Sequence, residues 1–287
     1  MVTDTKVPTV VSVLNLKGGV GKTTITALLA REAAAKGLKV LAVDLDPQAN
    51  LSQALMGDHQ YQQFMDDKQS SIVELFNGYL PTSAHRPAPS TLNYADIIKP
   101  FSGKWSATGS IIPSRFDFSY NLINSVQKDQ TVLARFIGNE MMDVDLILID
   151  CAPTESILTR TAYHASRYIL IPVRTEFFST IGFPLMNESL STFRNENRGH
   201  SIDVCGVIIN KNRSKKSPLG PHHRDAYSDI VEKAQEYEWP IFDNKMNHSD
   251  GYPKMAKEIY PTHIRNARYE FPNIAREFFQ KINLQIN

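Results

Sequence analysis

The sequence has no long hydrophobic run and almost no net charge. It contains 287 residues, of which 42% are hydrophobic and 21% charged, and its formal net charge at pH 7 is +1. No stretch reaches the roughly 18 uncharged apolar residues of a membrane span, and the polar start MVTDTKVP is not that of a signal peptide. We therefore expect a cytoplasmic globular protein in which any contact with nucleic acid comes from a local patch.

Cysteine is scarce as well. Cys151 and Cys205 are the two in the chain, and each lies in or beside an apolar, strand-like run. Thiols in such surroundings of a cytoplasmic protein are usually reduced and behave as small hydrophobic side chains. We expect both to be buried and structural.

The densest pattern in the chain lies at residues 9–24, TVVSVLNLKGGVGKTT. The segment from Thr9 to Leu14 is apolar and rich in β-branched residues, which predicts a buried strand. A helix-forming segment follows over 23–36, directly after a run of glycines. This order predicts a strand, a phosphate-binding loop and a helix.

The residue types in the loop suit a nucleotide. Glycines at 18, 19 and 21 let successive backbone N–H groups point inward and hold phosphate oxygens at the helix N-terminus. Lys22 would then reach the β and γ phosphates, and the hydroxyl of Thr23 would bind magnesium. We predict a nucleotide site here in preference to a simple tight turn.

One detail departs from the ordinary P-loop pattern. Six residues before Lys22, where that pattern has glycine, this chain has Leu16, and an extra lysine, Lys17, precedes the glycines. The string KGGVGKTT is the deviant Walker A motif, so the sequence resembles the ParA/MinD superfamily of P-loop ATPases. This resemblance implies that Lys17 reaches across a dimer interface to the partner's nucleotide. The implied nucleotide contacts are Lys17, Gly18, Gly19, Val20, Gly21, Lys22, Thr23 and Thr24.

A pair of carboxylates lies at the end of the second expected strand, residues 39–45, in the string VDLDPQAN. Side chains at i and i+2 of an extended strand face the same side, so Asp44 and Asp46 can both lie beside the phosphate loop. By the resemblance, Asp44 belongs to the magnesium and water shell, and Asp46 positions the attacking water. The alternative is that these carboxylates cap the next helix.

Two further strand ends carry polar residues of the same kind. The run 145–150, DLILID, has the Walker B pattern, in which Asp150 would hold a magnesium-bound water. Asn210 ends the strand expected over 203–210, where the superfamily uses an asparagine to read the adenine edge. Its amide can both donate and accept, although a turn-forming asparagine is the alternative.

A basic stretch, KNRSKKSPLGPHHR, comes next without an acid among its cations. Such a segment can neutralise phosphates without reading bases, and the alternative is a solvated loop. ParA-like ATPases hold non-specific DNA with basic residues near this edge, so the resemblance favours DNA contacts. The candidates are Lys211, Arg213, Lys215 and Lys216, followed by Arg265 and Arg268.

The C-terminal part departs from the family. Where relatives have an Ile-Pro-Arg element that closes over the base, this chain has KMNHSDGYPKMAKE, so base contacts from this element are in doubt. We expect a last strand over 241–246 and a tail over 271–284 that packs on the core. A MinD-like membrane helix is the alternative for the tail, but its cations are few and are offset by acids.

Strands alternate with helices along the chain, which predicts an α/β fold with a doubly wound, mostly parallel sheet and helices on both faces. We expect a single P-loop NTPase domain over 1–287, with a loop-rich insert around 58–126. Because residues 1–8 are too few for a helix-turn-helix, sequence-specific DNA binding is not expected.

The resemblance implies a ParA-like partition ATPase that forms a homodimer on binding ATP and Mg²⁺. The dimer would hold double-stranded DNA non-specifically on the nucleoid and release it after slow hydrolysis, stimulated by a ParB-like partner. Lys17, Lys22 and Asp46 would be the catalytic residues. The alternatives are a MinD-like membrane switch, a metabolic ATPase of the dethiobiotin synthetase kind, and an iron–sulfur reductase like the nitrogenase iron protein, for which the cysteines stand in the wrong contexts.

Overall fold

The computed structural model describes residues 7–78, 94–102, 108–118, 129–176, 180–210, 221–247, 249, 251–257 and 265–286. Within these parts of the chain, seven strands form one sheet in the order β3-β4-β2-β5-β1-β6-β7. The strands are β1 (Thr9–Val13), β2 (Val40–Leu45), β3 (Lys99–Pro100), β4 (Gly109–Ile112), β5 (Leu146–Cys151), β6 (Tyr168–Arg174) and β7 (Asp203–Asn210). All neighbours pair in parallel except β3 with β4, which confirms the mostly parallel sheet.

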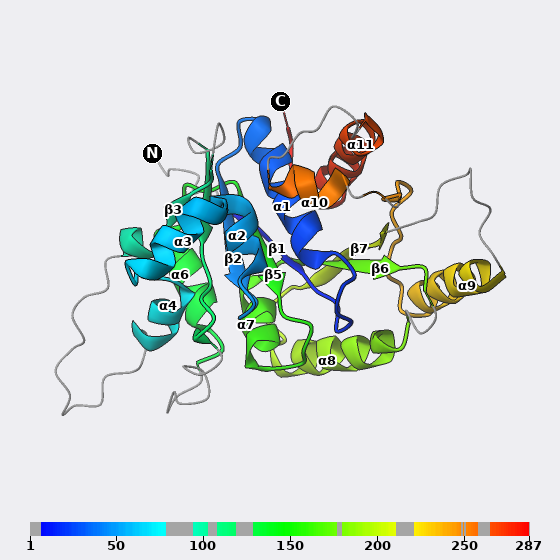
Figure 1. Ribbon diagram of the computed structural model, residues 1–287. Coiled ribbons are helices and arrows are strands. Elements are labelled where there is room, and N and C mark those ends of the chain that lie inside the picture. Colours follow the sequence, from blue (N-terminus) through cyan, green and yellow to red (C-terminus); the bar gives the residue numbers. More distant parts are fainter. Residues whose placement is uncertain are drawn as a thin grey trace.

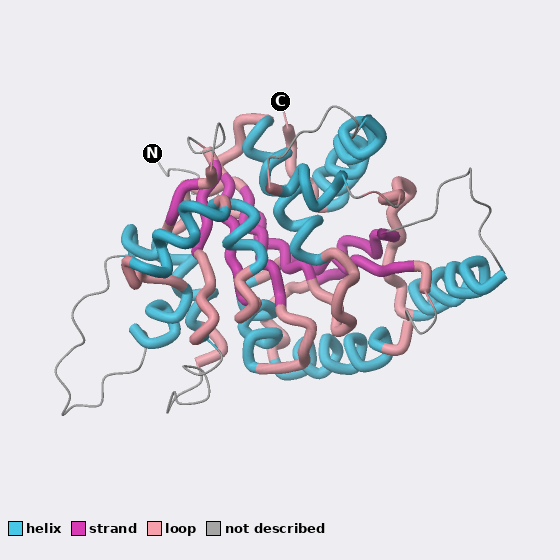
Figure 2. Tube along the Cα trace, in the orientation of Figure 1, coloured by secondary structure: helices cyan, strands magenta, loops and turns pink. Residues whose placement is uncertain are grey.

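The strands are buried on both faces, as parallel strands between layers of helices must be. Val11 and Val13 of β1 pack into the core on one side of the sheet, whereas Val10 packs into the core on the other. This follows from the alternation of side chains along a strand. Figures 1 and 2 show the result, a sheet with helices above and below it.

Each face has its own set of helices. One core holds residues of α1 (Lys22–Ala35), α2 (Asn50–Met56), α3 (Asp58–Asp66), α10 (Gly251–Ala256) and α11 (Arg265–Lys281). The opposite core holds residues of α4 (Ile72–Gly78), α6 (Val132–Glu140), α7 (Ile157–Ala165), α8 (Gly182–Glu196) and α9 (Pro221–Glu236). The short 3-10 helix η1 (Tyr94–Ile97) contributes Ile97 to this second core. The sheet is therefore doubly wound, as predicted.

The prediction of a strand over 241–246 is wrong. Only an isolated bridge joins Ile241 to Val207, although the amides of Phe242 and Met246 donate to carbonyls of β7 at 2.9 Å. The amides of Asp243 and Asn244 donate instead to the carboxylate of Glu277 on α11, at 2.7 and 2.9 Å. Because α11 takes these donors, the segment follows β7 without forming a ladder.

The tail packs on the core, as predicted. Phe278, Phe279 and Ile282 are at most 2% exposed and belong to the core that contains α1. No helix in the described residues has the length and apolar character needed to span a bilayer. The apolar face of α11 is thus occupied inside the protein.

The close contact between Gly206 and the ring of Phe242 gives a test of this packing. A Cβ at Gly206 would lie 2.5 Å from Phe242 Cε2 and 3.2 Å from the Pro240 carbonyl oxygen. We expect Gly206→Ala to lower the free energy of unfolding by about 1–3 kcal/mol, because an overpacked core strains its neighbours.

Urea denaturation would measure this loss, with Gly138→Ala as the matched control. Gly138 lies exposed on α6 with no heavy atom within 4 Å of its would-be Cβ. Alanine there should be neutral or stabilising by up to about 1 kcal/mol, since an alanine loses less backbone entropy than a glycine when the helix forms. Equal stability of the two variants would contradict the packing described here.

Candidate functional site

The glycine loop between β1 and α1 is anchored from both sides. The side chain of Asn15 accepts a hydrogen bond at Oδ1 from the amide of Lys17 at 2.8 Å. Its Nδ2 donates to the Pro172 carbonyl of β6 at 2.7 Å. Gly19 and Gly21 have φ angles of 71° and 98°, a left-handed region that favours glycine. The loop therefore holds its shape against the neighbouring strand before α1 begins.

Lys22 lies inside this loop. Its Nζ donates to the carbonyl oxygens of Asn15 and Lys17 at 2.9 and 3.3 Å, and the residue is 7% exposed. Burial lowers the pKa of the Lys22 ammonium, an effect opposed by the nearby Asp150. The structure thus places the Lys22 ammonium within the glycine loop, and its contact with phosphates stays a prediction.

Two carboxylates meet beneath the loop. Parallel pairing sets Asp44 of β2 beside Asp150 of β5, and both are fully buried. Thr23, at the start of α1, donates its hydroxyl to Asp150 Oδ2 at 2.6 Å. The structure therefore brings together the three residues that the sequence predicted for magnesium.

The surroundings of these carboxylates disfavour their charge. Burial raises the pKa of the Asp44 carboxyl to about 7, against hydrogen bonds from Ser52 that lower it. Burial and the neighbouring Asp44 likewise raise the pKa of Asp150 well above its usual value. Asp150 Oδ1 is buried without a hydrogen-bond partner among the described residues. A cation between the loop and these acids would compensate all three effects.

The donor set fits Mg²⁺ in the form that phosphate loops use. A hydroxyl and carboxylate oxygens are hard ligands, and Mg²⁺ usually takes one or two carboxylates and completes its shell with water and substrate phosphates. In the part of the chain that the structure describes, no group of three or more His, Cys, Asp or Glu could hold a metal by itself. Thr23, Asp44 and Asp150 would hold Mg²⁺ together with water and phosphate ligands.

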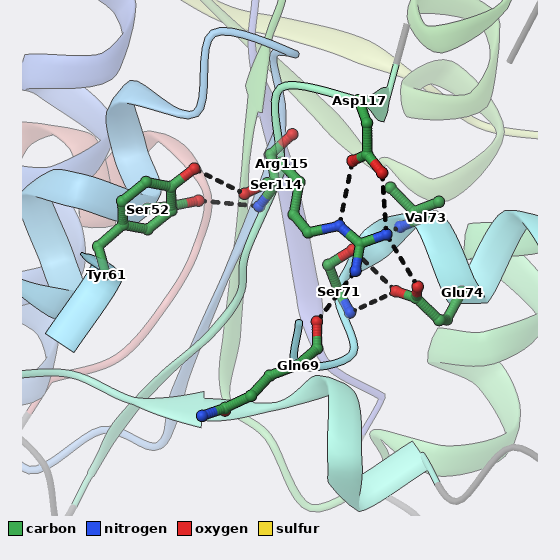
Figure 3. A network of polar contacts seen from close by, with 9 residues as sticks. All are labelled: Ser52, Tyr61, Gln69, Ser71, Val73, Glu74, Ser114, Arg115 and Asp117. Carbon is green, nitrogen blue, oxygen red and sulfur yellow. Dashed lines mark hydrogen bonds and ion pairs between the residues drawn. The ribbon is translucent and has the colours of Figure 1, made fainter. Parts of the chain in front are cut away.

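Asp44 is tied into a polar network that extends away from the loop. Ser52 of α2 donates its amide and its hydroxyl to Asp44 Oδ2, at 2.8 and 2.7 Å. The Ser52 hydroxyl in turn accepts the amide of Ser114, whose carbonyl accepts the hydroxyl of Tyr61 (Figure 3). These contacts fix the Asp44 carboxylate between α2 and the segment after β4.

Arg115 anchors that segment in turn. Its guanidinium bonds both carboxylate oxygens of Asp117 and lies 3.1 Å from Glu74 Oε1 on α4 (Figure 3). It also donates to the carbonyl of Gln69 at 3.2 Å. The sequence offered no motif for this cluster, which lies within the stretch predicted as a loop-rich insert.

Asp46 occupies the wall of the cavity above the loop. Its carboxylate accepts the amide of Gln48 at 2.9 Å, and the residue is 8% exposed. Thr23 and Thr24 line the same cavity from the start of α1. Asp46 thus faces the space in which a bound phosphate chain would end, whereas Asp44 lies below it.

Asn210 closes the loop from the end of β7. Its Nδ2 donates to the Val20 carbonyl at 2.7 Å, and a Cβ on Gly21 would lie 2.1 Å from that nitrogen. Asn210 therefore ends β7, as predicted, and it does so beside the loop. Its role toward a base stays a prediction.

The side chain of Lys17 pairs with an acid outside the loop. Its Nζ lies 3.8 Å from Glu176 Oε2, and its side chain is about one-third exposed. Arg174 at the end of β6 also pairs with Glu176. The exposed position is compatible with a contact to a second subunit, which stays a prediction.

The cavity above the loop has a volume of about 560 Å³. One part of its lining comes from the loop, Asp46 and Asn210. The other comes from the segment for which the sequence left base contacts in doubt, through Met246, Asn247, Ser249, Tyr252, Pro253, Ala256 and Lys257. Sequence reasoning missed these residues as a pocket wall because they match no motif of the family.

Both cysteines are free and buried, as predicted. Burial raises the pKa of Cys151 strongly and that of Cys205 to about 12, so neither is a reactive thiolate.

The DNA candidates Lys211, Arg213, Lys215 and Lys216 lie outside the described residues. Arg265 and Arg268 belong to α11, and their side chains lie outside the described part of the structure.

Comparisons with known proteins point the same way as the geometry. A family model described as an AAA domain, AAA_31, matches residues 8–202. The chromosome partitioning protein ParA of Caulobacter vibrioides is 26% identical over 267 residues, which cover 87% of this chain and 93% of that protein.

Two solved structures show the same fold. A variant of Cyanothece McdA in complex with ATP matches with a TM-score of 0.73 and 17% identity, covering 98% of both chains. Cobyrinic acid a,c-diamide synthase of Mycobacterium smegmatis, with a bound ATP analog and magnesium, matches with a TM-score of 0.70 and 21% identity. That match covers 94% of this chain and 93% of the synthase chain.

The contact between Gly21 and Asn210 makes the loop testable without touching a charged residue. We expect Gly21→Ala to lower the free energy of unfolding by about 1–3 kcal/mol, because a left-handed backbone costs a side-chain-bearing residue about 1–2 kcal/mol and Asn210 must also move. Nucleotide affinity should fall with it, measured by titration with a fluorescent ATP analogue.

Gly18→Ala is the matched control for stability. No heavy atom lies within 4 Å of a Cβ built at Gly18, and its φ is outside the left-handed region. Its free energy of unfolding should change by less than about 1 kcal/mol. A Gly21→Ala protein as stable as Gly18→Ala would contradict the loop geometry.

Proposed function

This chain belongs to the family of the AAA domain model that matches residues 8–202, within the ParA/MinD superfamily of P-loop ATPases, and from this premise we propose that it is a partition ATPase. It would bind Mg-ATP, dimerise around two nucleotides and hold DNA non-specifically as the dimer. Hydrolysis stimulated by a partner protein would then release the DNA.

The observation that carries the proposal is the convergence of four functional groups on one cavity. Lys22, Thr23 and Asp46 line it, and Asp150 lies directly beneath, bonded to Thr23. They come from α1, β5 and the segment after β2, which are parts of the chain far apart in sequence. This set provides a phosphate cradle, a place for a metal and a carboxylate at the open end.

Each residue then has a physical task. The loop amides and the Lys22 ammonium would hold the β and γ phosphates and stabilise the charge that develops between them. Asp46 would orient a water for in-line attack on the γ phosphorus. Bound magnesium would neutralise charge on the phosphates, held through Thr23 and the acids Asp44 and Asp150.

Lys17 would act in the dimer. Its Nζ lies 3.8 Å from Glu176 Oε2 in a partly exposed position, from which the lysine would reach a phosphate across an interface. Its charge would then add to that of Lys22 in the other subunit. ATP binding would in this way favour the dimer, and hydrolysis would weaken it again.

The proposed partners are DNA and a ParB-like protein. Lys211, Arg213, Lys215 and Lys216 would bind DNA phosphates, with Arg265 and Arg268 as further candidates. A ParB-like protein would stimulate hydrolysis, and the protein would work in the cytoplasm on the nucleoid. The cargo would be a plasmid, a chromosome or a protein assembly.

A metabolic ATP-dependent enzyme is the second candidate. The observation in its favour is the fold match to cobyrinic acid a,c-diamide synthase, together with a cavity that extends from the phosphate loop to α10. Such an enzyme would need a second small substrate and would not need DNA. The membrane switch finds less support, because the apolar face of α11 is buried in the core.

DNA binding separates these candidates. We expect a random-sequence duplex to show raised fluorescence anisotropy with the protein in Mg-ATP and little change in Mg-ADP. Replacing Lys211, Arg213, Lys215 and Lys216 with alanine should weaken this binding and reduce its log–log salt slope by about one for each DNA phosphate that is no longer neutralised. ATP affinity should stay unchanged.

Two outcomes of the DNA-binding measurement would change these assignments. Unchanged DNA affinity in the fourfold variant would move the assignment to Arg265 and Arg268. Absence of DNA binding by the wild-type protein in both nucleotide states would contradict the partition proposal and favour the metabolic one.

Asp46→Ala tests the catalytic assignment. Without a carboxylate to orient water, turnover should fall about 100-fold or more, while the ATP-bound dimer persists. Phosphate release and size-exclusion chromatography with ATP would measure the two properties. Asp143→Ala, which removes an exposed acid outside the cavity lining, is the control and should keep full turnover.

A further inference from the structure

Two side chains of the cavity wall are held by a single carboxylate on another helix. Asn247 donates through Nδ2 to Glu270 Oε1 at 2.9 Å, and Tyr252 donates its hydroxyl to Glu270 Oε2 at 2.7 Å. Asn247 and Tyr252 line the cavity, whereas Glu270 belongs to α11 and does not. Glu270 thus sets the position of a wall that it does not itself form.

Strand order places this wall at the end of the cavity away from the chemistry. The phosphate loop follows β1, and on one side of it Asp46 follows β2 and Asp150 lies near the end of β5. On the other side lie β6 and β7, where Asn210 ends β7 and the Met246 amide donates to the Ile209 carbonyl at 2.9 Å. Residues from Met246 onward therefore begin beside Asn210.

A nucleotide with its phosphates in the loop and its last phosphate toward Asp46 would extend toward this wall. Its ribose and base would reach Asn210 on β7 and then Asn247 and Tyr252. A carboxylate can only accept hydrogen bonds, so Glu270 fixes the amide of Asn247 with its nitrogen toward α11. It fixes the Tyr252 hydroxyl in the same way, and Tyr252 is 3% exposed.

We propose that Glu270 is a positioning residue for the nucleoside end of the nucleotide site, acting through Asn247 and Tyr252. In this chain the pair replaces, with different residues, the base-closing element that the sequence lacks. The inference rests on the nucleotide binding proposed above and adds to it the residues that hold the ribose and base. Binding energy from the phosphates does not depend on Glu270.

A matched control lies seven residues further along the same helix. Glu277 accepts the amides of Asp243 and Asn244 and the Asn244 side chain, at 2.7, 2.9 and 2.8 Å. It fastens the same segment to α11, but neither Asp243 nor Asn244 lines the cavity. Glu277→Ala therefore reports the structural effect of losing a carboxylate anchor without disturbing the wall.

The test compares ATP with inorganic tripolyphosphate, both with Mg²⁺, by isothermal titration on the full-length protein. Tripolyphosphate has the three phosphates without ribose or base. Glu270→Ala should weaken ATP binding about tenfold, because two charge-assisted hydrogen bonds that order the wall are lost, and should change tripolyphosphate binding less than about twofold. Glu277→Ala should leave both affinities within about twofold of wild type.

A second pair of variants guards against misfolding of the first. Asn247→Ala and Tyr252→Phe remove the side-chain groups that Glu270 holds and should each weaken ATP selectively. Equal losses for ATP and tripolyphosphate, or no loss of ATP binding in any of these variants, would overturn the role of Glu270. A wild-type protein that binds neither ligand would instead overturn the proposed nucleotide site itself.

Discussion

The electrostatics of the candidate site depend above all on two buried acids that lie side by side. Parallel pairing of β2 with β5 places Asp44 directly beside Asp150, away from solvent. Like charges in such a place repel, and burial alone already penalises them. Ser52, Thr23 and Lys22 offset part of this cost, and a cation brought by a phosphate ligand would offset the rest. These electrostatics support the proposed binding of a metal together with phosphate.

The surrounding fold holds these acids in place from two directions. On one side, Ser52 links Asp44 to Ser114 and so to the Arg115 cluster, which joins α2, α4 and the segment after β4. On the other, the phosphate loop is fastened to β6 through Asn15 and to β7 through Asn210. The proposed phosphate contacts would thus depend on strand ends, as precise sites require.

The wall facing the loop is built differently. The short helix α10 and the described residues before it form this wall, which is fastened to α11 through Glu270 and to β7 through the amide of Met246. Arg31 of α1, 4% exposed, adds a tie by donating to carbonyls of Ala54 and Ala256 at 2.9 Å. The cavity therefore lies between a rigid floor and a wall whose position follows α11.

The sequence by itself determined the parts that depend on local pattern. Apolar runs predicted β1, β2, β5 and β7, and the glycines with Lys22 and Thr23 predicted the loop, because strand, loop and helix are adjacent in the chain. Only tertiary structure decided the partners of Asp44, the absence of a strand over 241–246 and the wall held by Glu270. The wall depends on a contact between residues 18 positions apart, the segment over 241–246 on one between residues 34 positions apart, and the surroundings of Asp44 on the pairing of its strand with that of Asp150. In all three, packing and competing hydrogen-bond acceptors outweigh local preference.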